Sequence, residues 1–241
     1  MIVQSTDFGW EIIHQQAHGL LAVQAALHWH PDKRPVRWIE TLVALTEHDD
    51  GQEPWEGRNH LTEAGAPKHF QIQQYSVEQC RNMIAIALEK SRWNALMVSK
   101  HASYLYESKR GEDKELDEFL DQQKTNQRDW TRQLKSSVRD VQYAYDFLQW
   151  CDALSLILCM GRLPDDERKL EISPGPDRIP YFISQRSDQT LAVEPWPFDV
   201  EQFSIHVEVY AVRQLAFSDD HELYDALHKT ELREREWTFR R

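Results

Sequence analysis

Histidine and aspartate residues occur along the chain where their side chains could ligate a metal ion. His18 opens one apolar helical stretch, and the neighbouring residues His48 and Asp49 end the next one. Asp152 lies in a run of apolar residues, where burying an unpaired charge would cost several kcal/mol. Imidazole nitrogens combined with carboxylate oxygens suit first-row transition metals better than Ca²⁺. We therefore expect these four residues to bind Mn, Fe, Ni, Co or Zn, as one ion or two.

Two further observations bear on this prediction. The Asp152 carboxylate must be neutral, paired with a cation such as Arg81 or Arg139, or bound to a metal. His101 shares a helical face with apolar residues, so its imidazole is expected to point inward. A single histidine on such a face is usually a core residue, but three inward histidines and two aspartates favour a site. His101 is then a ligand of a second ion or a general acid or base.

The segment from Asp50 to Phe70 contains several glycines and prolines and is predicted to be a long loop. Loops of this length in a compact domain are usually functional or disordered. Asp50 and Glu53 are candidates for orienting a nucleophile. Arg58 and Lys68 would contact a phosphate group if the loop closes over a substrate, and an ordinary solvated loop is the alternative.

These residues and their surroundings resemble the HD-domain superfamily of metal-dependent phosphohydrolases. The family pattern has a histidine on one helix, a His-Asp pair ending the next helix, and a distant aspartate on a later helix. His18, His48, Asp49 and Asp152 match it, and the resemblance covers roughly residues 14–160. The chain is also similar to a divergent bacterial branch of unknown function. The resemblance implies a hydrolase that uses a metal-activated water on a small phosphorylated substrate, such as a nucleotide.

Two other functions stay open. One is a di-iron oxygenase, because some members of the superfamily use extra histidine ligands for oxygen chemistry. His101 and His69 would then help to hold two iron ions. In a non-catalytic binding protein, the helical core would survive, and the acidic surface or the C-terminal strands would engage a partner.

Hydrophobic periodicity predicts the elements that must position these residues. Six prolines and glycines from residue 161 to residue 180 indicate a connector. The expected fold is mainly α, an HD-like bundle with a small antiparallel β appendage. Its parts are a metal-binding domain (1–160), the connector (161–180) and a C-terminal appendage (181–241). Helices are predicted at residues 19–29, 36–47, 77–106, 141–160 and 219–236, with a possible break near Ser91 and solvated helices between 107 and 140. Strands are predicted at 1–3 and 10–13, which form a short hairpin, and at 181–183, 191–193 and 203–209, the last with alternating apolar residues.

Composition restricts the partners. The 241 residues carry a formal net charge of -12 and are 41% hydrophobic, which favours a soluble protein with a packed core. Such an acidic chain is a poor match for nucleic acid or an anionic membrane, whereas a bound cation would still permit a small anionic substrate. No signal peptide precedes residue 12, and the longest apolar stretch is too short to span a bilayer. A cytoplasmic location is expected, and a homo-oligomer is left open.

Overall fold

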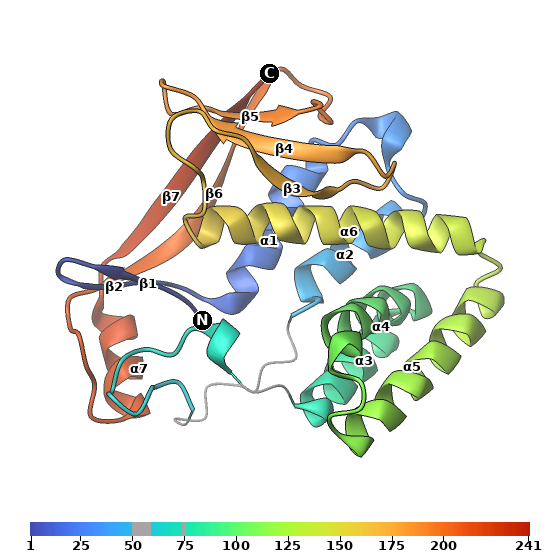
Figure 1. Ribbon diagram of the computed structural model, residues 1–241, viewed down its shortest axis with the longest axis horizontal. Helices are drawn as coiled ribbons and strands as arrows, with labels where there is room; N and C mark the ends of the chain where they lie inside the picture. The colour runs from blue at the N-terminus through green and yellow to red at the C-terminus, as the bar shows by residue number, and fades with distance from the viewer. Residues whose placement is uncertain (50–58, 74–75) are drawn as a thin grey trace.

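A computed structural model describes residues 1–49, 59–73 and 76–241. Seven strands form a single curled, mixed sheet in the order β1-β2-β6-β7-β5-β4-β3 (Figure 1). The strands are β1 (Ile2–Thr6), β2 (Gly9–Ile13), β3 (Leu170–Pro174), β4 (Pro180–Gln185), β5 (Leu191–Glu194), β6 (Gln202–Val212) and β7 (Leu232–Arg240).

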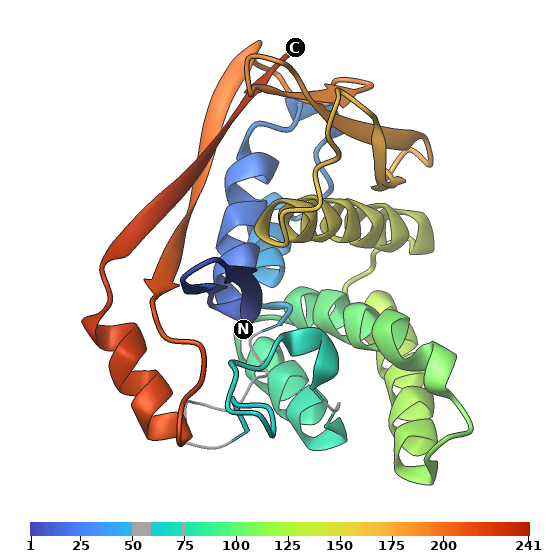
Figure 2. The ribbon, with the colours of Figure 1, turned by 60° about the vertical axis from the view of Figure 1, so that its left-hand side comes forward.

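Helix α1 lies on the inner side of the curl, with α2 to α6 beside and beyond it, whereas α7 belongs to a second hydrophobic cluster with residues of β2 and β6 (Figure 2). Serine or aspartate side chains cap α3, α4, α5, α6 and α7, each by accepting a backbone N–H of the first turn. The helices are α1 (Gln15–Leu27), α2 (Trp38–Glu47), α3 (Val77–Lys90), α4 (Arg92–Tyr106), α5 (Lys114–Gln133), α6 (Val138–Cys159) and α7 (Asp220–Lys229).

Several sequence predictions are confirmed. The N-terminal hairpin is formed by β1 and β2, and the predicted helical region from residue 77 to residue 106 is divided at Ser91. Ser91 ends α3 and caps α4, because its hydroxyl oxygen accepts the N–H of Asn94. Strand β6 alternates as expected: Phe203 and Ile205 begin its row of buried residues, while the residues between them are exposed.

The predicted fold class is wrong, because the strands form a full layer instead of a small appendage. The protein is 49% helical and 21% strand. The N-terminal hairpin does not stand apart: β2 pairs with β6 and so joins the C-terminal strands. Strand β3 lies inside the segment predicted to be a connector. The expected helix at residues 219–236 ends at Lys229, and the residues that follow form β7. Residues 232–240 are mostly polar and exposed, so hydrophobic periodicity did not indicate a strand there.

The sheet curls around α1, which packs against β6, while α6 packs against β3 (Figure 2). Helices α3, α4 and α5 form a second layer on the far side of α1 and α6. One continuous hydrophobic core contains residues from the sheet and from both helical layers. Its aromatic centre is Trp29, which contacts Phe147 and Trp150 of α6 and Phe198 of the segment before β6. Among the described helices, none is long and apolar enough to cross a membrane.

Candidate metal centre

A close approach of α1 and α2 brings the first two histidines together. Gly19 of α1 lies against the last turn of α2, where a Cβ atom at this position would be 2.8 Å from the carbonyl oxygen of Thr46. A larger residue would therefore push the two helices apart. His18 precedes this glycine and His48 follows α2 directly, so both imidazoles lie at the contact.

Both imidazoles are held in the same way. The Nδ1 atom of His18 donates to the carbonyl oxygen of Gln15, and the Nδ1 atom of His48 donates to the carbonyl oxygen of Leu45 at 2.7 Å. Each ring thus folds back onto the carbonyl three residues earlier in its own helix. Because Nδ1 carries the proton, the Nε2 atom of each neutral ring presents a lone pair. Histidines that bind metals usually have this arrangement.

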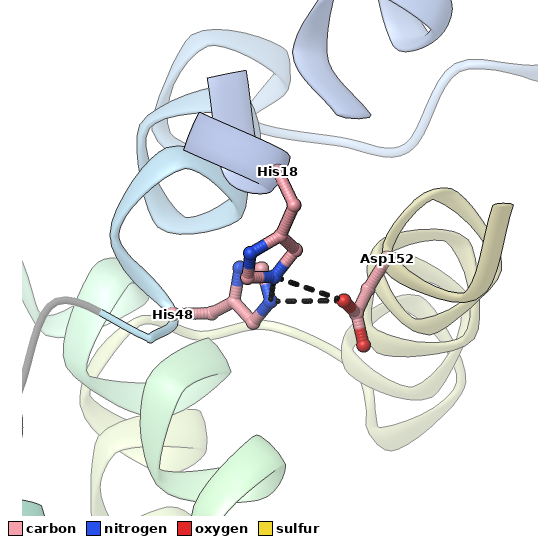
Figure 3. A group of neighbouring side chains, drawn as sticks. All are labelled: His18, His48 and Asp152. Atoms are coloured by element: carbon pink, nitrogen blue, oxygen red, sulfur yellow. Dashed lines mark hydrogen bonds and ion pairs between the residues drawn. The ribbon is translucent and has the colours of Figure 1, made fainter. Parts of the chain in front are cut away.

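Asp152 of α6 completes a compact triangle of ligand atoms (Figure 3). The two Nε2 atoms of His18 and His48 are 3.2 Å apart. The Oδ1 atom of Asp152 lies 3.3 Å from the Nε2 atom of His18 and 3.2 Å from that of His48. His18 and His48 are fully buried, and Asp152 is 8% exposed. The Oδ1 atom is buried, and none of the described residues donates a hydrogen bond to it. The three side chains could hold a metal ion.

Asp49 extends this cluster towards Gln15. Its Oδ2 atom lies 3.5 Å from the Nε2 atom of His18 and accepts a hydrogen bond from Nε2 of Gln15 at 2.9 Å. Asp49 also belongs, with His48 and His101, to a second group of side chains that could hold a metal ion.

His101 points inward from α4, as its helical face predicted, and is 2% exposed. Its Nε2 atom lies 3.9 Å from the Oδ1 atom of Asp49, and its ring packs edge-on against His48 with the centroids 4.8 Å apart. The Nδ1 atom of His101 is buried without a hydrogen-bond partner.

The pKa values of the neighbouring residues His48 and His101 are shifted in opposite directions. Burial opposes the charged form of His48, but the carboxylates of Asp152 and Asp49 outweigh it and raise the pKa of His48 to about 9. Burial, followed by the repulsion of His48, lowers the pKa of His101 to about 4. Burial would raise the pKa of Asp152, but the charge of His48 holds it well below its usual value. In the absence of an ion, a proton on His48 thus balances the carboxylates, whereas His101 is neutral.

A pocket of about 370 Å³ opens onto the cluster. Asp49, Asp152 and His101 line it, whereas His18 and His48 are buried outside its lining. The remaining described lining combines amide and apolar side chains with one lysine, from α1, the turn at residues 70–72, α3, α4, the turn at residues 107–109 and α6. These residues are Gln15, Phe70, Gln71, Gln73, Ser76, Gln79, Cys80, Met83, Ala102, Leu105, Tyr106, Lys109 and Leu156.

Two of the residues considered in the loop, Lys68 and His69, are described, and neither joins this group. Asp50, Glu53 and Arg58 lie outside the described residues. Lys68 is partly exposed and does not appear in the described lining of the pocket. His69 stacks on Phe70, and its imidazole accepts the N–H of Gln71.

The arginines considered as partners of Asp152 lie elsewhere. Arg81 pairs with Glu115 at 2.5 Å, and Arg139 is exposed. Among the described residues, Asp152 therefore faces two imidazoles and no guanidinium group, which leaves a proton or a metal ion to balance its charge.

Sequence reasoning missed Gln15, which begins α1 and is 4% exposed. Its place three residues before His18 puts both side chains on one helical face, so the spacing itself carried a signal. The pocket-lining glutamines of the chain from residue 71 to residue 79 gave no comparable signal, because only the folded chain brings them to α4.

The comparisons with known proteins place the chain in a family without assigning a reaction. No curated protein and no solved structure matches it. The resemblance to the HD-domain superfamily is wrong as a family assignment, because the matching family is a different one and no HD-domain family is found. That resemblance rested on short His and Asp motifs, and similar sets of side chains recur on unrelated folds. The chain belongs to the DUF3891 family, described as proteins of unknown function, whose model matches residues 1–214.

Proposed function

We propose that His18, His48 and Asp152 bind a divalent transition metal ion that activates water to hydrolyse a small phosphorylated substrate held in the pocket. The observation that carries this proposal is the buried triangle of two lone-pair nitrogens and the unpartnered Oδ1 atom of Asp152. Three such atoms repel one another unless a proton or a cation lies between them, and a metal ion would replace the proton on His48. The donor set suits Mn, Fe, Co, Ni or Zn.

The size of the triangle supports a first-row metal. An ion at a typical bond length of about 2.1 Å from three atoms about 3.2 Å apart would lie about 1 Å above their plane. The angles between its ligands would be about 100°, between the tetrahedral and octahedral values. All three ligands lie on one side of such an ion. The other side is then free for Asp49, water and substrate.

One ion fits the residues better than two independent ions. Both groups of candidate ligands require His48, yet its Nδ1 atom is committed to the carbonyl of Leu45. Its single remaining nitrogen can bind one ion. We therefore assign His101 to acid–base chemistry beside the ion, for which a neutral imidazole that lines the pocket is suited.

The chemistry follows from a bound ion with open positions. Such an ion lowers the pKa of a bound water towards neutrality and neutralises charge on a phosphoryl oxygen. His101 is placed to move a proton to or from the reacting groups. Lys109 is the cationic side chain among the described residues that line the pocket, and it would meet a substrate anion there.

Elemental analysis of protein purified without chelator tests the centre. We expect one transition metal ion per chain, and its loss in His48→Ala and Asp152→Ala. His206→Ala, which changes an exposed histidine of β6, is the matched control and should retain the metal. Metal-loaded protein should then hydrolyse 4-nitrophenyl phosphate or bis(4-nitrophenyl) phosphate and lose this activity on chelation. Wild-type protein that takes up no metal after reconstitution would overturn the proposal in favour of a non-catalytic binding protein.

A second candidate function is iron-dependent oxygen chemistry. Two histidines and one carboxylate on one side of an ion, with open positions opposite, are also the ligand set of non-haem Fe(II) oxygenases. Iron as the native metal, together with visible absorption that changes on exposure to oxygen, would favour this function. A colourless, iron-free protein that hydrolyses phosphate esters would exclude it.

A further inference from the structure

One buried polar atom beside the metal centre, the Oε1 atom of Gln15, has no hydrogen-bond partner among the described residues. Gln15 lines the pocket and is 4% exposed. Its Nε2 atom donates to Oδ2 of Asp49 at 2.9 Å, while its Oε1 atom is buried without a hydrogen-bond partner. Leaving a buried acceptor unpaired is unfavourable by about 1–3 kcal/mol, so a partner that the described residues do not supply is expected here.

The orientation of this amide follows from its neighbours. A carboxylate can only accept hydrogen bonds, so the NH₂ group of Gln15 must face Asp49 and the carbonyl oxygen must point away from it. The backbone of Gln15 is also fixed, because its carbonyl oxygen accepts the Nδ1–H of His18. The residue thus touches one metal-ligand candidate through its backbone and another through its side chain. Its free oxygen is held beside the cluster in one orientation.

A carbonyl oxygen needs a proton donor or a cation. Resting on the metal centre proposed above, we infer that the Oε1 atom of Gln15 accepts a hydrogen bond from the group bound to the ion. The centre should therefore prefer ligands that keep a proton on the atom bound to the metal. Water, hydroxide and a sulfonamide nitrogen that retains one N–H belong to this class, whereas ligands without that proton leave Gln15 unpaired.

This role would also orient the nucleophile. A bound water that donates one hydrogen bond to Gln15 cannot rotate freely about its bond to the ion. The lone pair of its oxygen can then face the pocket, where the substrate lies. Because Asp49 holds the amide of Gln15, the position of Asp49 would also determine the direction from which water attacks.

A matched pair of probes tests the inference on wild-type protein. Trifluoromethanesulfonamide binds metals as an anion whose nitrogen keeps one proton, and its N-methyl derivative binds with none. We would load the protein with Co²⁺ and titrate both probes by visible absorption. We expect the parent compound to bind about 10- to 100-fold more tightly, the range that corresponds to one unsatisfied buried acceptor.

Two variants separate the hydrogen bond from the bulk of the methyl group. Gln15→Met has a similar volume and no acceptor, so it should bind the two probes with equal affinity. Gln79→Met changes another pocket-lining glutamine, of α3, and should keep the wild-type preference. Equal affinities in wild-type protein, or a preference that persists in Gln15→Met, would overturn the inference while the bound cobalt upholds the centre. Protein that binds no cobalt would overturn both.

Discussion

At the residue scale, the arrangement of nitrogens and protons in the cluster determines what each side chain can do. His48 is needed by both groups of candidate ligands but has one nitrogen to offer. His101 is buried beside it, yet burial and the repulsion of His48 keep its pKa at about 4. A neutral imidazole with an unpartnered Nδ1 atom is free to exchange a proton with substrate or water.

Replacing His101 distinguishes acid–base chemistry from metal ligation. His101→Gln should retain the metal of wild-type protein and lower the rate of hydrolysis by about 100- to 10,000-fold. Metal content and turnover are measured on the same preparation. Loss of the ion in this variant would show that His101 is a ligand and would contradict the assignment.

Cys80 reports on the pocket through its pKa. Burial, only partly offset by a hydrogen bond with Tyr106, raises the pKa of its thiol from 9.0 to about 11. Because the thiolate is the reactive form, alkylation at pH 8 should be about 100-fold slower than for a thiol of ordinary pKa. The rate should rise about tenfold for each pH unit up to about pH 11, as followed by mass spectrometry after iodoacetamide treatment. A rate that already levels off near pH 9 would contradict this.

The sequence predicted the burial of Asp152 in the cluster but not that of Gln15, because Asp152 carries a charge and Gln15 does not. A carboxylate within an apolar helix, such as Asp152, must find a partner, so its burial could be inferred from its neighbours alone. Gln15 is uncharged, and its burial beside Asp49 depends on the contact between α1 and α2. Only its spacing of three residues from His18 distinguishes it from the exposed glutamine that follows it.

At the scale of elements, the packing of α1 on α2 controls the distance between His18 and His48. Gly19 permits this contact, because a Cβ atom there would meet the backbone of Leu45 and Thr46. These neighbours are backbone atoms of a helix and cannot rotate away as a side chain would. The separation of the two imidazoles therefore depends on a residue that has no side chain.

Gly19→Ala should weaken both the fold and the metal centre. We expect the free energy of unfolding to fall by about 1–3 kcal/mol, the range for overpacking a tight contact, although alanine favours helices. Metal affinity should fall as the two imidazoles separate. Leu20→Ala, an exposed position on the same helix, is the control and should change neither quantity. Chemical denaturation and metal titration measure the two effects, and a more stable Gly19→Ala variant would contradict the packing argument.

Elements whose ends are set locally were the easier ones to predict. Ser91 both ends α3 and caps α4, so a single capping residue indicates the break between these helices. Strand β7 is different, because eight of its nine residues are not buried and its partners β6 and β5 come from earlier in the chain. Its charged residues are also typical of a solvated helix, and only the pairing with β6 and β5 distinguishes the two structures.

At the scale of the whole molecule, β7 joins two parts of the sheet. It pairs antiparallel with β6 along its whole length, and Phe239 near its end pairs parallel with Leu191 of β5. The side chain of Phe239 is fully buried and stacks on Phe203 with the ring centroids 4.9 Å apart. The sheet thus has its most polar strand in the middle of its strand order and fixes it there with one aromatic side chain.

Phe239→Ala should destabilise the protein by about 3–5 kcal/mol, the usual range for emptying a buried aromatic position. Thr238→Ala, on a side chain that is only partly buried, is the control and should have a small effect. Denaturant unfolding followed by circular dichroism measures both. A loss below that of the control would mean that β7 is dispensable for joining the two parts of the sheet.

The position of β7 has a consequence for how the protein is made. The ribosome completes β1, β2 and β6 on one side and β3, β4 and β5 on the other before it synthesises the strand that lies between them. Until then, the edges of β6 and β5 that pair with β7 in the complete protein would lack that partner. The side chains of the metal cluster, from His18 to Asp152, have all been synthesised by that stage. Because β7 follows the other described strands in the sequence, a message truncated before residue 232 would encode every side chain of the metal cluster but not the strand that joins β6 to β5.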